Sequence, residues 1–151
     1  MKHYIIDGNN LLGKTQHLSK INKKDKSEAA RKLALIIGRY FNQKKVLVSL
    51  HFDGVSREVI KVNGIKIFHS GKLSADEKIK DEISNSKNLR NIVLVTSDKN
   101  LADFGRVCSC DVIKSEEFSI LLSKQKLSQE KESIIEDLKD ETFFKKLFGL
   151  D

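Results

Sequence analysis

The chain has 151 residues, of which 39% are hydrophobic and 32% are charged, and its formal net charge at pH 7 is +7. This length and composition predict one soluble globular domain, and they exclude a membrane-spanning protein because the longest apolar stretches are far too short to cross a bilayer. The positive charge favours a polyanionic partner, nucleic acid or a membrane surface, over a small acidic metabolite.

Short apolar segments alternate with amphipathic ones along the chain. In chain order we expect a strand at 3–6, a polar and basic segment at 14–26, a helix at 27–43, strands at 45–53 and 65–68, a helix at 74–87, a strand at 92–95, a helix at 98–106, a strand at 107–113, helices at 115–125 and 128–140, and a terminal turn at 142–150. The strands are continuously apolar, which is typical of a parallel sheet covered on both faces. The sequence therefore predicts an α/β fold with a mostly parallel five-stranded sheet. We expect the first strand to be central and the strand order to be 3-2-1-4-5. Residues 1–151 would form a single domain, with residues from about 126 to 151 as a helical extension packed on it.

The cysteines and the N-terminus indicate a cytoplasmic protein. Cys108 and Cys110 are two residues apart in the strand expected at 107–113, so both would face the same side, which disfavours a disulfide between them. They are expected to be reduced core residues. The chain enters a strand almost at once and shows no signal-peptide pattern.

Acidic residues follow the apolar strands at the point where each strand ends. Asp7, Asp53 and Asp98 follow the first, second and fourth strands, and Asp76 lies in the first turn of the helix after the third. In a parallel sheet these carboxyl ends meet at one edge, so the four carboxylates should converge there. Oxygen ligands without a nearby cysteine or histidine group suit Mg²⁺ or Mn²⁺. Such an ion can activate water and neutralise charge on a phosphodiester.

Each of these residues also has a structural explanation. Asp98 could cap its helix, Asp76 could complement the helix dipole, and Asp53 before a glycine could belong to a turn. Asn10 could hold a ligand water or a phosphate oxygen, or it could simply lie at a helix start. Their joint placement favours the acidic metal site.

The segment Gly8–Thr15 fits the phosphate-loop pattern G-x-x-x-x-G-K-[ST], which leaves a nucleotide-binding protein as an alternative. A phosphate cradle needs small residues, whereas Leu11 and Leu12 favour burial. The residues after Thr15 form a poor amphipathic helix, and Asp7 would place a negative charge beside the phosphates. A hairpin turn at Asp7-Gly8 would account for only one of the four acids.

The sequence resembles the YacP-like branch of the NYN domains, which are PIN-like ribonucleases. The resemblance rests on four stretches in the family's order: YIIDGNNLL, VSLHFDG, HSGKLSADEKI and LVTSDKNLADFGRVCSCDVIKSEEF. It implies a PIN-like three-layer fold and a metal-dependent ribonuclease, a hydrolase that cleaves RNA phosphodiester bonds endonucleolytically with Mg²⁺ or Mn²⁺. Carried over by position, Asp7, Asn10, Asp76 and Asp98 fall on the catalytic site, with Asp7, Asp76 and Asp98 as metal ligands.

One position departs from the family pattern. The family often has an acid four residues after the Asp of its A-D motif, and here that residue is Lys80. Asp53, Glu77 and Asp81 are the other candidate ligands. The site could therefore hold one metal or use a neighbouring acid, and a catalytically inactive RNA-binding PIN-like module remains an alternative.

Basic residues are expected to bind the RNA backbone, because the sequence shows no aromatic stacking platform of the usual RNA-binding kinds. The candidates are Lys14, Lys20, Lys23, Lys24, Lys26, Arg31 and Arg57. Solvated surface positions are the alternative for the lysines. The expected partner is RNA, either alone or within a ribonucleoprotein such as the ribosome, and neither a membrane nor a small-molecule cofactor is expected.

Overall fold

The computed structural model of the protein describes residues 1–125. Residues 1–119 form one compact unit that contains the whole sheet, and residues 120–125 are helical. The helix expected at 128–140, the terminal turn at 142–150 and the packing of the C-terminal extension all lie outside the described residues. Within those residues, no helix has the length and hydropathy needed to cross a bilayer.

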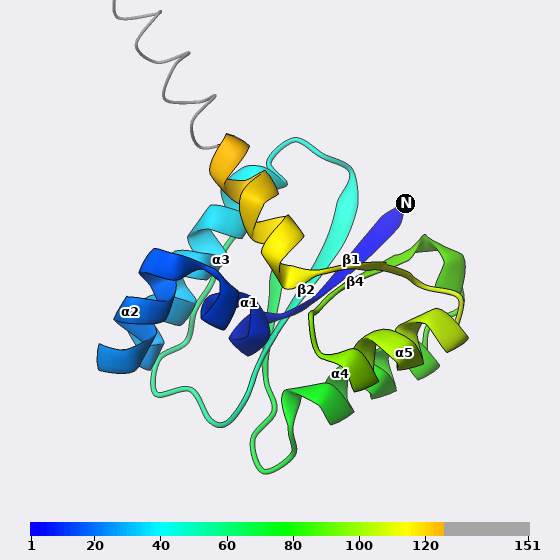
Figure 1. Cartoon of the computed structure of the whole chain (residues 1–151), viewed down its shortest axis with the longest axis horizontal. Coiled ribbons are helices and arrows are strands. Elements are labelled where there is room, and N and C mark those ends of the chain that lie inside the picture. The colour runs from blue at the N-terminus through cyan, green and yellow to red at the C-terminus, as the bar shows by residue number, and fades with distance from the viewer. Residues whose placement is uncertain (126–151) are drawn as a thin grey trace, which may run out of the picture. The chain divides into compact units, whose positions relative to one another are not determined.

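The core of this unit is a five-stranded sheet in which all paired strands are parallel (Figure 1). Its order is β3-β2-β1-β4-β5, which confirms the predicted topology. The strands are β1 (Lys2–Asp7), β2 (Val46–Phe52), β3 (Lys66–His69), β4 (Ile92–Val95) and β5 (Asp111–Ile113). Strand β4 is apolar and buried along its whole length, and β1 is buried from Ile5 to Asp7, as expected for central strands covered from both sides.

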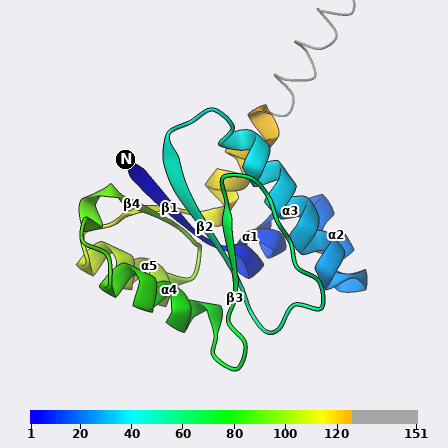
Figure 2. The same cartoon turned by 180° about the vertical axis from the view of Figure 1, so that it is seen from behind.

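Helices cover the two faces of the sheet, as Figures 1 and 2 show. On one face lie α1 (Gly8–Lys14), α2 (Gln16–Lys24) and α3 (Lys26–Tyr40). On the other lie α4 (Ala75–Ser84) and α5 (Lys99–Val107), whose apolar side chains pack with Ile5 and Leu94 of the sheet. A short 3-10 turn, η1 (Leu89–Asn91), precedes β4, and residues 115–125 form the helix that the sequence predicts there.

Helix capping explains where two of these helices begin. The predicted capping residue Ser74 accepts a hydrogen bond from the Glu77 backbone N–H at 3.2 Å, so the start of α4 is confirmed. The start of α3 was assigned wrongly to Ser27, because Asp25 caps the helix by accepting from the Glu28 N–H at 3.1 Å. The chain therefore enters α3 slightly earlier than the apolar stripe alone suggests.

Residues Gln16–Lys24, within the segment described from the sequence as polar and basic, form the helix α2. The judgement that the residues after Thr15 form a poor amphipathic helix is therefore wrong, because the helix is amphipathic and its one fully buried side chain is Leu18. The helix packs beside α1 and α3.

The last strand is shorter than predicted. The helix α5 continues to Val107, and the chain then turns through Ser109, whose φ is +68°, before β5 begins at Asp111. Cys108 and Cys110 flank this turn and do not share one side of a strand. Both are free thiols, and Cys110 is buried in the core cluster under α4 and α5.

Candidate acidic site at the carboxyl edge of the sheet

Asp7 lies at the end of β1 and is almost completely buried, with 5% of its surface exposed. Its Oδ1 accepts a hydrogen bond from the Asn10 backbone N–H at 3.4 Å and thereby caps α1. Its Oδ2 accepts from the Thr96 hydroxyl at 3.0 Å. Burial raises the pKa of Asp7 to about 6 against these two hydrogen bonds, and the nearby charges of Asp76 and Asp53 add to the rise.

The turn from β1 into α1 depends on Gly8. A Cβ atom at this position would lie 2.6 Å from the carbonyl oxygen of His51, so only glycine fits against β2 here. Asp7 is therefore held at the junction of the central strand with a helix that starts immediately after it.

Asp98 follows β4 and caps α5 by accepting a hydrogen bond from the Leu101 N–H at 2.9 Å. The structural explanation offered by the sequence is thus correct, but it uses only one of the two carboxylate oxygens. The Asp98 backbone N–H donates to the Thr96 hydroxyl oxygen at 3.1 Å, and the same hydroxyl donates to Asp7. Thr96 therefore couples the positions of the two aspartates.

Asp76 and Asp53 complete the acidic edge. Burial raises the pKa of Asp76, and the charges of Asp98 and Asp53 raise it further, whereas Lys80 opposes them. Asp53 is exposed, and its Oδ1 accepts from the Ala75 N–H at 2.7 Å, which ties the end of β2 to the start of α4. Its own N–H donates to Asn9 Oδ1 at 2.6 Å.

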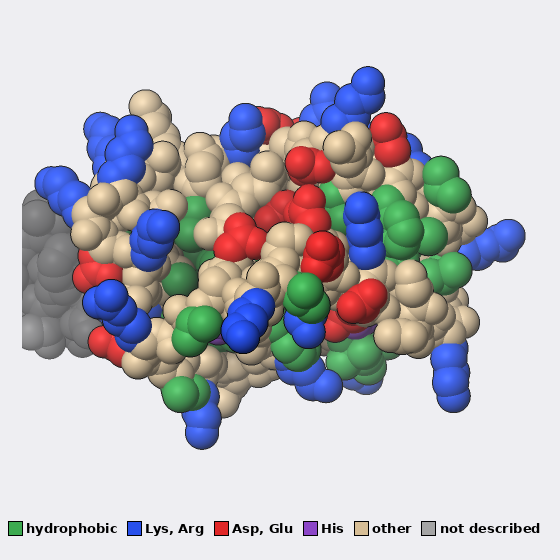
Figure 3. Space-filling model, turned by 90° about the horizontal axis from the view of Figure 1, so that it is seen from below, with side chains coloured by type: hydrophobic (Ala, Val, Ile, Leu, Met, Phe, Trp, Pro, Cys, Tyr) green, Lys and Arg blue, Asp and Glu red, His purple; other side chains and the backbone are tan. Residues whose placement is uncertain are grey.

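The structure thus brings the four predicted aspartates to one edge of the sheet, where they influence one another's ionisation. Viewed from below the sheet, acidic side chains gather near the middle of the surface, with lysine and arginine side chains around them (Figure 3). Among residues 1–125, however, no three Asp, Glu, His or Cys side chains already stand close enough together to hold a metal ion. The other two candidate ligands, Glu77 and Asp81, are exposed on α4, and neither contributes to the raised pKa of Asp7 or Asp76.

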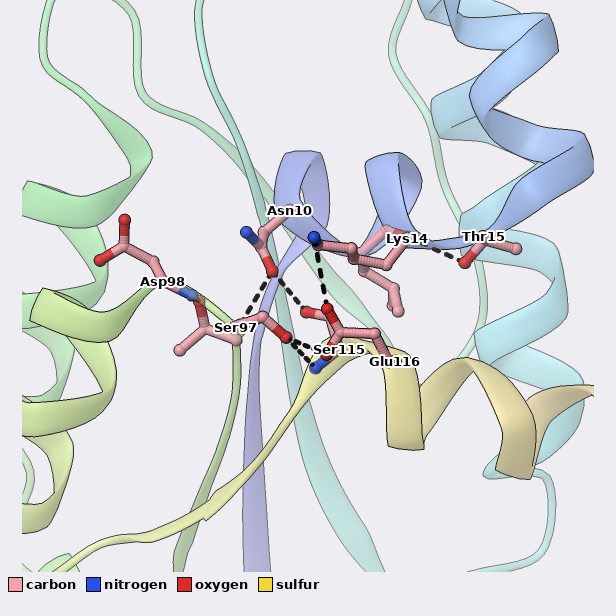
Figure 4. A network of polar contacts seen from close by, with 9 residues as sticks. Asn10, Lys14, Thr15, Ser97, Asp98, Ser115 and Glu116 are labelled. Atoms are coloured by element: carbon pink, nitrogen blue, oxygen red, sulfur yellow. Dashed lines mark hydrogen bonds and ion pairs between the residues drawn. The ribbon is translucent and has the colours of Figure 1, made fainter.

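Asn10 lies at the start of α1, as one of its two predicted roles requires, and its side chain belongs to a polar network (Figure 4). Its Oδ1 accepts from the Ser97 N–H at 2.9 Å and from the Ser115 hydroxyl at 2.7 Å. Ser97 Oγ in turn accepts from the Ser115 N–H at 2.9 Å and donates to Glu116 Oε2 at 2.6 Å. With Oδ1 held in this way, the amide nitrogen of Asn10 is left to meet an outside acceptor.

The sequence analysis missed Thr96 and Glu116 as parts of this edge. The hydrogen bond from Ser97 and the charge of Lys14, whose Nζ lies 3.3 Å from Glu116 Oε1, keep the pKa of Glu116 below its usual value. Thr96 directly follows β4, so its position carries the same signal that identified the aspartates. Glu116 lies three residues after β5 and is recognised through its contacts with Ser97 and Lys14.

The phosphate-loop alternative does not agree with the backbone. Residues Gly8–Lys14 form an α-helix that begins directly after the strand, so their N–H groups do not wrap around an anion as a phosphate cradle requires. Lys14 pairs with Glu116, and the Thr15 hydroxyl donates to the Leu11 carbonyl oxygen at 2.8 Å. Leu11 and Leu12 are buried, as their side chains favour.

The basic candidates differ in their surroundings. Lys14 and Arg31 are engaged in ion pairs, the first with Glu116 and the second with both oxygens of Glu28. Four other predicted RNA-binding residues are exposed: Lys20, Lys23 and Lys24 on α2, and Arg57 in the loop after β2. A cavity of about 100 Å³ beside Asp53 is lined by Asn22 and Lys26, so the junction of α2 and α3 borders the acidic edge.

Comparison with known proteins agrees with this geometry. The sequence profile of the YacP-like NYN domain matches residues 4–147. The fold is similar to the crystal structure of Rae1 (YacP) from Bacillus subtilis, with a TM-score of 0.76 and 18% identity over 99% of this chain and 88% of that one. It is also similar to a single-residue variant of Rae1, with a TM-score of 0.72 and 19% identity over 92% of this chain and 87% of that one.

No curated protein matches the sequence. The profile match covers nearly the whole chain, and the parallel sheet in the order 3-2-1-4-5 carries its acids at the carboxyl edge, as the sequence resemblance implied. The protein therefore belongs to the family of YacP-like NYN domains, which have a PIN-like nuclease fold.

Proposed function

We propose that the protein is a metal-dependent ribonuclease that cleaves RNA internally at the acidic edge of its sheet. The observation that carries this proposal is the convergence of four aspartates on one edge of the sheet: Asp7, Asp53, Asp76 and Asp98. Burial raises the pKa of Asp7 and of Asp76, and the charges of the neighbouring aspartates raise both further. Such crowding is costly when the carboxylates are ionised, and a hard divalent cation is the usual offset.

The donor set fits Mg²⁺ or Mn²⁺. It consists of carboxylate oxygens, and within residues 1–125 no side-chain hydrogen bond engages Asp76 or the Oδ2 atom of Asp98. Asp7, Asp76 and Asp98 would hold the ion, with Asp53 beside them, after small side-chain movements. When bound, a divalent ion neutralises charge on the phosphodiester and activates the attacking water.

Other residues of the site would position the RNA. The amide nitrogen of Asn10, oriented by the bonds that Ser97 and Ser115 donate to Oδ1, would donate to a phosphate oxygen. Asp7 is buried, but Asp53 is exposed and Asp76 and Asp98 are partly exposed, which gives an internal stretch of an RNA strand access to these three acids. This access is the reason for proposing endonucleolytic cleavage.

The experiment that tests the proposal uses the purified full chain with a linear labelled RNA and a circular RNA of the same sequence. With Mn²⁺ or Mg²⁺ we expect both to be cleaved, and the circle to be opened, whereas EDTA should abolish cleavage. Cleavage that is undiminished in EDTA would contradict the metal site, and attack on the linear RNA alone would contradict endonucleolytic action.

An inactive RNA-binding module is the second candidate, and Lys80 favours it. This lysine lies on α4 one turn after Asp76, lowers the pKa of that carboxyl, and stands 5.5 Å from the centre of the Phe104 ring. A fixed cation there could offset the acidic charge without a metal. RNA binding without cleavage under all ion conditions would support this candidate.

RNA affinity is expected to depend on the α2 lysines more than on net charge. Lys23→Ala combined with Lys24→Ala should weaken RNA binding and flatten the slope of log K against log salt by about 0.7 per lost phosphate contact. The matched control, Lys2→Ala with Lys45→Ala, removes the same charge at the opposite edge of the sheet, where β1 and β2 begin. Fluorescence anisotropy over a salt series measures the RNA affinity and its salt dependence for both double variants. Equal slopes for the two would show that α2 does not contact the RNA.

A further inference from the structure

A second polar site lies on the same face of the sheet as α4, away from the four aspartates. The helices α4 and α5 leave the β2–β3 part of this face uncovered, and Leu47 and Phe68 are 51% and 38% exposed there. In Figure 2 the edge strand β3 crosses in front of the sheet with α4 to one side. A cavity of about 440 Å³ lies on this surface, and a second of about 340 Å³ shares Phe68 and Glu82 with it. These volumes are typical of small-molecule sites.

The Glu82 carboxylate is the polar centre of both cavities. Its Oε2 accepts from the Ser49 hydroxyl at 3.1 Å, and its Oε1 accepts from His51 Nε2 at 3.2 Å. Because Ser49 has a single hydroxyl proton and donates it to the carboxylate, His3 Nε2 donates to Ser49 Oγ, at 2.8 Å. Ser49 and His51, the two side chains that donate to Glu82, are buried and hold the carboxylate in place, and His3 orients the Ser49 hydroxyl.

The hydrogen bonds from Ser49 and His51 leave the Glu82 carboxylate with unused acceptor capacity. Each carboxylate oxygen accepts one hydrogen bond, from Ser49 or from His51, and a carboxylate oxygen can accept a second one. Burial raises the pKa of Glu82, but the hydrogen bonds and charge of His51 and the bond from Ser49 outweigh it, and the pKa lies below its usual value. The side chain is 24% exposed and stays ionised near neutral pH, ready to accept from a ligand with two adjacent donors.

An aromatic wall and two cations accompany the carboxylate. The Phe68 ring stacks on His51 with their centres 4.8 Å apart and an interplanar angle of 17°. Lys66 lines the larger cavity and Lys78 the smaller, and both are exposed. An aromatic ring, a hydrogen-bonding group for a base edge, and cations for the backbone are what proteins use to bind an unpaired nucleotide. The sequence analysis expected no stacking platform, because Phe68 belongs to an apolar strand pattern and its exposure follows only from the uncovered sheet face.

The chemistry of the carboxylate selects among the bases. Guanine presents two neighbouring donors, N1–H and the N2 amino group, which match the two oxygens of a carboxylate. Adenine and cytosine present one amino group beside a ring-nitrogen acceptor, and uracil presents one N–H between two carbonyl groups. These acceptors would face the negative oxygens and be repelled.

The cavity is also close to the acidic edge. His51 is the register partner of Asp7 on the neighbouring strand, and Phe68 is the partner of His51 on the next. Since adjacent strands lie about 4.8 Å apart, Phe68 is roughly 10 Å from Asp7 across the sheet. A nucleotide near the bond held at the acids can therefore reach the cavity.

We propose that the cavity between α4 and the β2–β3 surface binds a guanine base, with Glu82 accepting from its N1–H and N2 amino groups and Phe68 packing against its ring. Lys66 and Lys78 contact the adjoining phosphates. As the source of the guanine we take the RNA substrate, and in this respect the inference rests on the proposed function; a free guanine nucleotide has the same recognition chemistry.

Binding measured in EDTA tests this site without requiring cleavage. The full chain is titrated into uridine oligonucleotides that carry one central G, A, C, U or inosine, with fluorescence anisotropy as the readout. The G oligonucleotide should bind about 10-fold more tightly than the others, as expected for one bidentate pair. Inosine, which lacks the N2 amino group, should lose most of this preference. Competition by GMP distinguishes the two sources: displacement at equal concentration indicates a free-nucleotide site, and weak displacement indicates a base within RNA.

Two variants locate the preference. Glu82→Gln should reduce it to less than 2-fold, while Glu117→Gln, the same charge change at an exposed position of the helix at 115–125, should keep it. Should Glu82→Gln fail to fold, Glu82→Asp keeps the charge but withdraws the oxygens, and it should lose the preference too. A parent protein that does not distinguish G from A and inosine, or a preference that persists without Glu82, would overturn the proposal. A guanine preference without any cleavage would support this binding site and contradict only the proposed ribonuclease activity.

Discussion

Replacing Asp98 with asparagine is expected to lower RNA cleavage by roughly 100-fold or more while RNA affinity persists or rises. Asparagine caps a helix as well as aspartate, so the bond from the Leu101 N–H that begins α5 is preserved. What disappears is one negative charge among four carboxylates. Affinity should not fall, because that charge repels the phosphates of the RNA.

Single-turnover cleavage in Mn²⁺ and binding in EDTA, measured on the same preparations, separate the two effects. Asp103→Asn is the matched control, because Asp103 is an exposed aspartate on the same helix that pairs with Arg106. It should cleave like the parent. An Asp98→Asn protein that is folded and cleaves at the parent rate would show that the carboxylate acts only as a helix cap.

Asp7→Asn is expected to abolish cleavage as well, but it should also stabilise the fold. Asp7 has a pKa of about 6 in the folded protein and an ordinary value of 3.8, so the folded state binds a proton more tightly than the unfolded state does. Stability therefore falls as pH rises from about 4 to about 6, and the penalty persists at higher pH. Two pKa units correspond to roughly 3 kcal/mol, a substantial share of the stability of a small domain.

Urea unfolding in EDTA at a series of pH values measures this penalty. The difference in unfolding free energy between Asp7→Asn and the parent should be near zero at pH 4 and approach about 3 kcal/mol at pH 7. Asp81→Asn, an exposed carboxylate on α4, should show no such trend. Saturating Mg²⁺ should narrow the gap by stabilising the parent alone. A difference in unfolding free energy that does not change with pH would mean that the ionised Asp7 carboxylate does not destabilise the folded state.

The fold and the four aspartates could be predicted from the sequence because both depend on local signals. Apolar runs that end in Asp7, Asp53 and Asp98 indicate strands and mark their carboxyl ends, and a parallel sheet brings those ends together. The helix α2 was missed because its residues are mostly polar and it buries only Leu18 completely, so its amphipathic pattern rests on few apolar positions.

The parts of the surface that the sequence did not predict depend on partners far apart in the chain. Glu82 meets Ser49 and His51 across more than thirty positions, and nothing near Glu82 in the sequence distinguishes it from other helix-surface glutamates. Glu116 is identified only through its bonds with Ser97 and Lys14. Such residues become visible when the topology is known, because the packing of α4 and of the segment after β5 decides which side chains meet.

The network around Asn10 determines when, during synthesis of the chain, the acidic edge can take its final geometry. Asn10 is oriented by Ser115, which lies 105 positions later in the chain, and Asp7 is bonded to Thr96, 89 positions later. Contacts of such long separation form late, after the intervening chain has been ordered. A nascent chain on the ribosome thus carries Asp7 and Asn10 from the first moments of synthesis, but these residues gain their working geometry only after β4, β5 and Ser115 have emerged. The activity proposed for this edge would be withheld until translation of the sheet is complete.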